Sequence, residues 1–186
     1  MKDNIMQYAA GEALNIWEAA KDPLNNFLKE TSKKPNPKLI KENKYAGNSK
    51  YLEIGYIEAK LDQVYHGLWS WEIKHAEQII NGVMIYGDLK VFHPVAQVWI
   101  VRSGIGFKEF QLSKGETERT PQNLSEKALE RDVPIAAAEA FKNASKKIGN
   151  TFGRHLNREF KYGHAEDKEF INRIYNTNKN DENETD

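Results

Sequence analysis

Cysteine is absent from this 186-residue sequence. Its absence excludes disulfides, thiolate zinc sites and cysteine nucleophiles, and it fits a reducing compartment. Long hydrophobic runs are absent as well, because no stretch approaches the roughly 18 apolar residues of a membrane-spanning helix. The N-terminal residues MKDNIMQYAAGEALN are interrupted by charged and amide side chains and lack the apolar segment of a signal peptide. We therefore expect a cytoplasmic protein without a membrane partner.

Net charge is also lacking, because 27 Lys and Arg balance 27 Asp and Glu. The charge is nevertheless distributed unevenly. Residues 31–50 contain six Lys and one Glu, a net charge of +5, and residues 138–161 contain six Lys or Arg and two Glu, a net charge of +4. Residues 177–186, with one Lys and four acids, carry −3. Polyanion binding depends on such local patches, so the neutral total does not exclude nucleic acid as a partner.

Motifs for nucleotide hydrolysis and for metal binding are missing too. No G-x-x-x-x-G-K-[ST] phosphate loop occurs, and the nearest glycine-rich stretch, SGIGFKEF, has a different spacing. The five histidines show no H-E-x-x-H or comparable spacing, and no cysteine is present to complete a zinc site. We expect no cofactor, no bound metal and no use of ATP.

One short pattern, Glu72-Ile73-Lys74, leaves an enzymatic alternative open. An acid-x-Lys on a strand occurs in metal-dependent nucleases, in which the acid binds the metal and the lysine steadies the attacking water. Such a site needs a second acid on a neighbouring strand, whereas the upstream candidate, Asp62, lies on an expected helix. A solvated face of a strand explains the same pattern.

Apolar spacing indicates how the flanking regions are organised. Residues 1–30 have apolar positions three and four apart and predict an N-terminal helical segment, in which Pro23 starts a second helix. Residues 31–50 contain two prolines, a glycine and a Lys/Asn bias, which predict a basic linker that is either a loop or becomes ordered on binding. Residues 51–65 favour a helix that follows a short extended segment and is ended by Gly67. Residues 113–133 predict a polar connector with a short helix near its end.

The region between residues 69 and 112 predicts a sheet, because its apolar period changes from near 3.6 to 2. Asn81-Gly82 is a strong hairpin signal, and His93-Pro94 and Ser103-Gly104 mark two further breaks. Four strands with short, antiparallel connections follow from these turns. The expected fold is therefore α+β: an antiparallel sheet backed on one face by a long basic amphipathic helix, with an N-terminal helical segment.

That basic helix is expected over residues 136–156, which read AAAEAFKNASKKIGNTFGRHL, with Pro134 in its first turn. Phe141, Ile148 and Phe152 fall on its apolar side and are expected to anchor it to the sheet. The opposite side carries the candidate phosphate-binding cations, which are Lys142, Lys146, Lys147, Arg154 and Arg158. An ordinary solvated amphipathic helix has the same pattern, so this alternative stays open.

Aromatic side chains supply candidate stacking surfaces for unpaired bases. Tyr56 and Tyr65 belong to the expected helix over residues 51–65 and are candidate DNA-binding residues. Aromatic residues beside a sheet also pack in cores, which is the alternative for both tyrosines.

Two blocks of the sequence resemble the Rad fifty-two superfamily of single-strand annealing proteins, which includes bacteriophage recombinases. The first block is YLEIGYIEAKLDQVYHGLWSWEI, and the second is the basic helix with its Gly-Asn-x-x-Gly end at residues 149–153. Together they span roughly residues 50 to 160. The chain departs from the family where Asn143 follows Lys142, since many members have adjacent basic residues there, and where Tyr56 stands near a position often held by Arg.

The resemblance implies a β-β-β-α core and ATP-independent binding of single-stranded DNA in a positively lined groove. It implies roles in that groove for Lys142 and Lys146, and also for Tyr56 and Lys60. The expected domains are a single-strand annealing core over residues 51–162, a C-terminal helix over 163–176 and a disordered acidic tail over 177–186. The implied assembly is a homo-oligomeric ring or filament.

The implied function is strand annealing in homologous recombination and double-strand break repair, in a phage or its bacterial host. The candidate partners are single-stranded DNA, further copies of the chain, and a single-strand binding protein or an exonuclease. Two other functions remain open: a metal-dependent nuclease that uses Glu72 and Lys74, and a passive DNA-end-binding protein.

Overall fold

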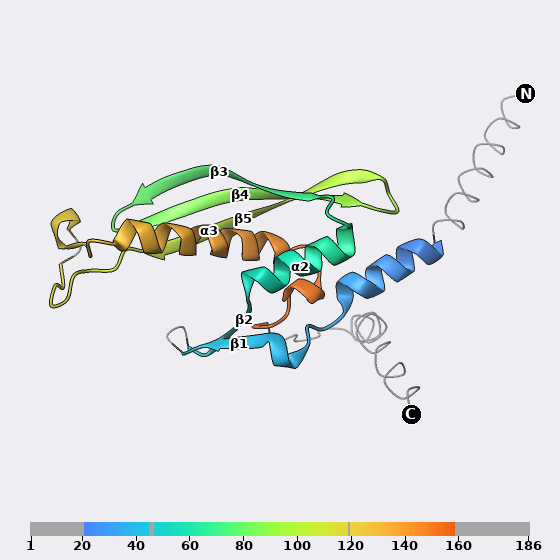
Figure 1. The fold of residues 1–186 in the computed structure, drawn as a ribbon, viewed down its shortest axis with the longest axis horizontal. Coiled ribbons are helices and arrows are strands. Elements are labelled where there is room, and N and C mark those ends of the chain that lie inside the picture. Colours follow the sequence, from blue (N-terminus) through green and yellow to red (C-terminus); the bar gives the residue numbers. More distant parts are fainter. Residues whose placement is uncertain (1–20, 45–46, 119, 159–186) are drawn as a thin grey trace, which may run out of the picture.

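A computed structural model describes residues 21–44, 47–118 and 120–158 of the chain (Figure 1). Residues 21–32 are helical. The predictions for residues 1–20, for the C-terminal helix and for the acidic tail lie outside the described residues. Within the described part the fold is α+β with an antiparallel sheet, as predicted. None of the helices in these ranges is long and apolar enough to cross a membrane.

The main sheet has three antiparallel strands in the order β3 (Trp69–Ile79), β4 (Gly82–His93) and β5 (Val98–Glu109). The turns predicted at Asn81-Gly82 and His93-Pro94 are confirmed, because they separate these strands. The prediction of a fourth strand was wrong. Ser103-Gly104 lies in the middle of β5, where it pairs with β4 instead of turning the chain.

The helix α3 (Ala128–Lys146) begins and ends earlier than predicted. Pro134 therefore lies inside the helix and not in its first turn. A proline there leaves the carbonyl of Glu130 without its helical N–H donor, but both residues are exposed and water can satisfy that carbonyl. After α3 the chain forms the short 3₁₀ helix η4 (Asn150–Phe152), so the predicted continuous helix to Leu156 was wrong.

The glycines of β5 mark the place where α3 crosses the sheet. A Cβ on Gly104 would lie 2.0 Å from the carbonyl oxygen of Ala140, and a Cβ on Gly106 would lie 2.1 Å from that of Ala136. Ala136, Ala140 and Ala144 are fully buried and form a stripe one helical turn apart. The glycines that looked like a hairpin signal thus allow the helix backbone to approach the strand.

Residues 31–50 are more ordered than the predicted linker. They contain the 3₁₀ helix η1 (Pro37–Leu39) and the strand β1 (Ile40–Asn43), which pairs antiparallel with β2 (Ser49–Leu52). Ile40 faces Leu52 across this hairpin, and Leu52 is buried in the core. The prediction of a loop was wrong there. The two strands are short and mostly polar, so their own sequence pattern does not mark them as strands, and packing of the Ile40–Leu52 pair stabilises them.

The helix α2 (Ile54–Tyr65) agrees closely with its prediction. Ile57 and Leu61 are buried on one side together with Tyr65, and the chain leaves the helix through His66 and Gly67, which both have positive φ. Figure 1 shows α2 and the β1–β2 hairpin on one side of α3 and the main sheet on the other.

The hydrophobic core forms on both halves of α3. Phe141 anchors the helix as predicted, since its ring packs against Trp71 and Trp69 at centroid distances of 5.4 and 6.0 Å. The first core cluster contains Leu52, Ile57, Leu61, Tyr65, Leu89, Val91, Phe141, Ala144 and Phe152. The second contains Val83, Ile85, Phe110, Ala128, Ala136 and Ala140.

Candidate nucleic-acid interface

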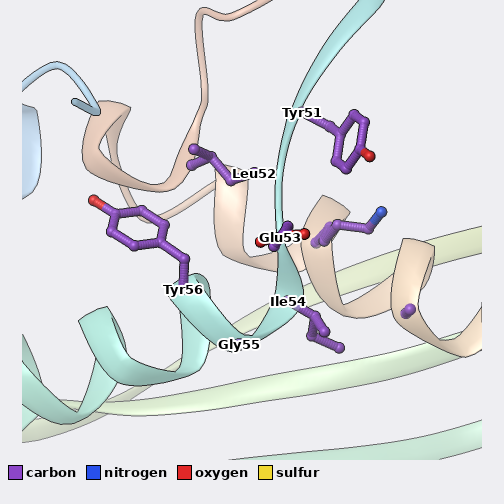
Figure 2. A pocket seen from close by; sticks show the side chains of 8 residues that line it. Tyr51, Leu52, Glu53, Ile54, Gly55 and Tyr56 are labelled. Carbon is purple, nitrogen blue, oxygen red and sulfur yellow. The ribbon is translucent and has the colours of Figure 1, made fainter. Parts of the chain in front are cut away.

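A cavity of about 540 Å³ lies where β2 runs into α2 and both meet α3 (Figure 2). Tyr51 and Tyr56 extend to opposite sides of the segment that joins β2 to α2. A cavity that combines aromatic rings with a cation suits a nucleotide, because bases stack on rings and phosphates bind cations. Its lining residues are Tyr51, Leu52, Glu53, Ile54, Gly55, Tyr56, Ala138 and Lys142.

Lys142 is the cation of this cavity. Its side chain is only 14% exposed, and its Nζ lies 5.4 Å from the centroid of the Tyr51 ring, within cation–π range. It also forms an ion pair with Glu139, one helical turn earlier. Its sequence neighbour Phe141 is buried in the core, so α3 holds the backbone of Lys142 in place. The ammonium group is therefore positioned by packing at the edge of the cavity.

Lys146 lies one turn further along α3 and continues the cationic row. Its Nζ donates a hydrogen bond of 2.9 Å to Oδ1 of Asn143. Burial lowers the pKa of Lys146, the charges of Lys142 and Arg158 lower it further, and Glu139 raises it. Lys142, Arg158 and the acid Glu139 thus all lie within electrostatic reach of Lys146.

The other two predicted cations of this region make hydrogen bonds to the backbone. Nζ of Lys147 donates to the carbonyl of Ser103 in β5 at 2.6 Å. Arg154 donates through Nε to the carbonyl of Lys146 at 3.2 Å and through Nη2 to that of Lys147 at 2.8 Å. Arg154 therefore caps carbonyl groups that the end of α3 leaves without helical donors.

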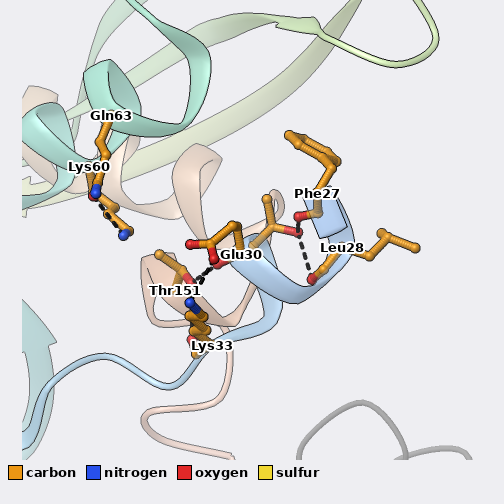
Figure 3. Close-up of polar contacts among 8 residues, drawn as sticks. Phe27, Leu28, Glu30, Lys33, Lys60, Gln63 and Thr151 are labelled. Carbon is orange, nitrogen blue, oxygen red and sulfur yellow. Dashed lines mark hydrogen bonds and ion pairs between the residues drawn. The ribbon is translucent and has the colours of Figure 1, made fainter. Parts of the chain in front are cut away.

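The three candidate residues on α2 also differ in whether they lie at the cavity. Tyr56 lines the cavity and is half-buried, and this burial raises its pKa. Lys60, one turn later, donates to Oε1 of Gln63 at 2.8 Å (Figure 3). Tyr65 is 4% exposed, its ring packs edge-on against Phe27, and burial raises its pKa to about 12. Tyr65 is thus placed in the core, where its ring has no surface for stacking on a base.

The β1–β2 hairpin supplies a cation that sequence reasoning missed. Lys41 pairs in register with Tyr51, and it forms an ion pair with Glu53 in the cavity wall. The hydrogen bond to Glu53 raises the pKa of Lys41. The +5 charge of residues 31–50 was the available signal. Only the strand pairing shows which of these lysines lies beside the cavity.

The Gly-Asn-x-x-Gly segment docks the helix of residues 21–32 against the end of α3 (Figure 3). A Cβ on Gly149 would lie 2.1 Å from the carbonyl oxygen of Thr31, so this close approach requires glycine. Oγ1 of Thr151 donates to the carbonyl of Glu30 at 2.6 Å and satisfies an acceptor at the end of that helix. The segment that carries the family resemblance thus has a structural role here.

The residues of the nuclease alternative do not gather into one site in the described structure. Oε2 of Glu72 forms ion pairs with Nζ of Lys74 at 2.8 Å and with Nζ of Lys90 at 3.1 Å. These contacts lower the pKa of Glu72. Asp62 instead accepts a bond of 2.7 Å from the indole of Trp69, whose ring packs on the core. Among residues 21–44, 47–118 and 120–158 no group of three or more His, Asp or Glu side chains could hold a metal ion.

Comparison with protein-family models gave no match to this chain, and a search of the curated proteins gave none either. The cavity, its cations and the resemblance of the two sequence blocks are therefore the basis for a functional proposal.

Proposed function

We propose that this protein binds single-stranded DNA without ATP and anneals complementary strands, as in homologous recombination and double-strand break repair. The observation that carries this proposal is the position of Lys142 over the ring of Tyr51 at the edge of one cavity, with Lys146 one helical turn away. The resemblance of residues 51–73 and of the basic helix to single-strand annealing proteins supports the same function.

In this proposal Lys142, Lys146 and Arg158 hold the phosphates of one strand. Release of condensed counterions makes such contacts favourable at low salt and weaker at high salt. The ring of Tyr51, beside Lys142, stacks on a base that faces the cavity, and the remaining bases stay free to test a second strand. Base pairing supplies the free energy of annealing, so the protein needs neither a covalent step nor a nucleotide cofactor.

Binding of a phosphate requires an exchange of ion pairs. Lys142 is paired with Glu139 in the free protein, and Lys41 is paired with Glu53. Glu139 is partly exposed, so water can solvate its carboxylate once a phosphate replaces it. A phosphate can accept several hydrogen bonds from the same lysine and its neighbours, which favours the exchange.

Self-association is part of the proposal. A chain with zero net charge offers only a short cationic row, and alignment of several copies in a ring or filament extends that row along a DNA strand. A single-strand binding protein or an exonuclease is a further candidate partner, and the cytoplasm is the expected compartment.

Duplex formation from two complementary oligonucleotides, without nucleotide and without Mg²⁺, tests the proposal. Wild-type protein is expected to accelerate it. The double variant Lys142→Gln with Lys146→Gln is expected to bind single strands at least about tenfold more weakly, because charged hydrogen bonds contribute about 1.5–3 kcal/mol each. Lys127→Gln is the matched control, since it removes one exposed charge at the start of the same helix.

Each other outcome selects a different function. Shortening of the strands on addition of Mg²⁺ selects the nuclease with Glu72 and Lys74. Binding without faster pairing selects the passive DNA-end-binding protein. Equal affinity of the double variant and the Lys127→Gln control rejects this cavity as the DNA site.

A further inference from the structure

The face of the main sheet that points away from α3 carries an exposed apolar stripe. Gly104 and Gly106 contact α3, so the odd-numbered residues of β5 point to the opposite face. No element of the described structure covers this face (Figure 1). Contiguous exposed apolar surface of this kind marks an interaction site. The stripe consists of Trp99, Val101, Ile105 and Phe107, whose exposed fractions lie between 46% and 56%.

The stripe reads almost the same in both directions from Ser103. An aromatic residue lies at each end, a β-branched residue follows on each side, and the serine lies in the middle. A two-fold axis beside Ser103, directed across the strand, therefore sets Trp99 of one copy against Phe107 of another. It also sets Val101 against Ile105. Self-complementary order of this kind is what an isologous contact requires.

We propose that two copies of this chain pack through this sheet face around a two-fold axis at Ser103. The polar groups at the centre of the contact are already satisfied within each copy. The hydroxyl of Tyr86 donates to Oγ of Ser103 at 3.1 Å, and Ser103 donates to Oδ1 of Asp88 at 2.7 Å. Covering this chain of hydrogen bonds leaves neither hydroxyl without a partner. Asp88 pairs in register with Ser103, so the axis also brings the Asp88 carboxylates of the two copies near each other, and this repulsion opposes the contact.

Copies cannot join as easily through the free edge of β5. Side chains already occupy the backbone acceptors there, and an added strand needs those acceptors for its own hydrogen bonds. The stacked face is therefore favoured over the edge of β5. The occupied carbonyls are those of Val101, Ser103 and Ile105, which accept from Arg102 at 3.1 Å, Lys147 at 2.6 Å and Asn143 at 2.9 Å.

The stripe is large enough for a stable pair. With roughly half of each side chain exposed, its four residues offer about 350–400 Å² per copy. Two copies then bury about 700–800 Å² of apolar surface. At the apolar fraction of about 60% that is typical of interfaces, the total is about 1,200–1,300 Å², which is in the range of specific dimers.

A two-fold contact closes after two copies, so this pairing is separate from the ring or filament of the proposed function, and it leaves the DNA cavity open. The cavity lies between α3 and the β2–α2 segment, whereas the stripe lies on the sheet face that α3 does not cover. Its test uses no DNA. The dimer and the DNA site can therefore fail independently.

The absence of native cysteine allows a direct test with single cysteines. Ser103→Cys is expected to form a covalent dimer with a short bifunctional thiol reagent, because the axis places the two thiols opposite each other. Stacked sheets about 10 Å apart hold the two Cα atoms too far apart for a direct disulfide. Trp99→Cys alone is expected to stay unlinked, since its two copies lie about 27 Å apart at about 3.4 Å per residue. A mixture of Trp99→Cys and Phe107→Cys is expected to link. Self-linking of Trp99→Cys, or failure of Ser103→Cys to link, overturns the arrangement.

The mass of the full chain in solution provides the second measurement. Ile105→Lys places a charge in the stripe and is expected to weaken dimerisation at least about tenfold. Leu129→Lys is the matched control, because Leu129 is 60% exposed on α3 and away from this face. Circular dichroism verifies that both variants fold. A monomeric wild type overturns the proposal. If the Ser103→Cys variant is then also protected from a thiol reagent, another segment of the same chain covers the stripe.

Discussion

Identical charges in one short segment have different roles at the residue scale. Lys142 lies over the ring of Tyr51 at the cavity, whereas Lys147 donates to the carbonyl of Ser103 in the sheet. Five residues separate them, which corresponds to about 140° around a helix. Composition counts the two lysines equally. Their contacts assign one to the proposed DNA site and the other to the docking of α3 on β5.

Asp132 is the residue whose burial has the clearest consequence for stability. Its side chain is fully buried, and it accepts hydrogen bonds from the backbone N–H of Gln111 at 2.8 Å and from Nε of Arg131 at 3.2 Å. Burial alone disfavours its charged form, but the bonds from Arg131 and Gln111 outweigh this, and the pKa of Asp132 lies below its ordinary value. The carboxylate ties the segment after β5 to α3.

Asp132→Asn is expected to lower the free energy of unfolding at pH 7 by about 1–3 kcal/mol, because the amide replaces a charged acceptor. The folded-state pKa is below the unfolded value of about 3.9, so the stabilisation is present above that pH and is lost as the pH falls through the folded value. Urea unfolding at neutral and acidic pH measures this. A deficit that stays the same in acid contradicts the assigned role.

At the scale of elements, local patterns predicted the type of most segments correctly but misplaced boundaries where tertiary contacts dominate. The bounds of α2 and the hairpin turn at Asn81-Gly82 follow from local periodicity and turn chemistry. Ser103-Gly104 has the composition of a turn, yet the strand continues through it because α3 needs the missing side chain at Gly104. A single sequence cannot distinguish a glycine for turning from a glycine for close packing.

Gly104→Ala tests this packing contact. The added methyl group would lie 2.0 Å from the carbonyl oxygen of Ala140, so α3 must move away from β5, at an expected cost of about 3 kcal/mol. Gly55→Ala is the contrast, because its Cβ would meet nothing within 4 Å in α2 and is expected to stabilise by about 0.5–1 kcal/mol. Thermal unfolding of both variants measures these two changes in stability. Equal stability of Gly104→Ala and wild type excludes the close contact.

The whole molecule concentrates positive charge although its total is zero. Lys142 of α3 lines the cavity, and Lys41 of the β1–β2 hairpin, about a hundred residues earlier, pairs with Glu53 in the cavity wall. Net charge therefore says nothing about the local field that a DNA strand experiences.

The salt dependence of DNA binding measures this local charge. With Lys142, Lys146 and Arg158 each neutralising one phosphate, the logarithm of the affinity is expected to fall against the logarithm of salt concentration with a slope near −2, at about 0.7 per contact. Fluorescence anisotropy of a labelled single strand provides the affinities. The Lys142→Gln with Lys146→Gln variant is expected to show a slope near −0.7. An unchanged slope in that variant means that the strand lies elsewhere.

The sequence by itself determined the α+β class, the antiparallel turns and the cationic character of the segment around Lys142, because these depend on periodicity, turn residues and charge along neighbouring positions. Only the tertiary structure decided which side chains meet. Lys41 lies beside Glu53 through strand pairing, Arg158 influences Lys146 after the chain turns back, and Tyr65 is buried in the core. The physical reason is that contacts between distant positions form only when packing brings their backbones together, and no local pattern encodes that choice.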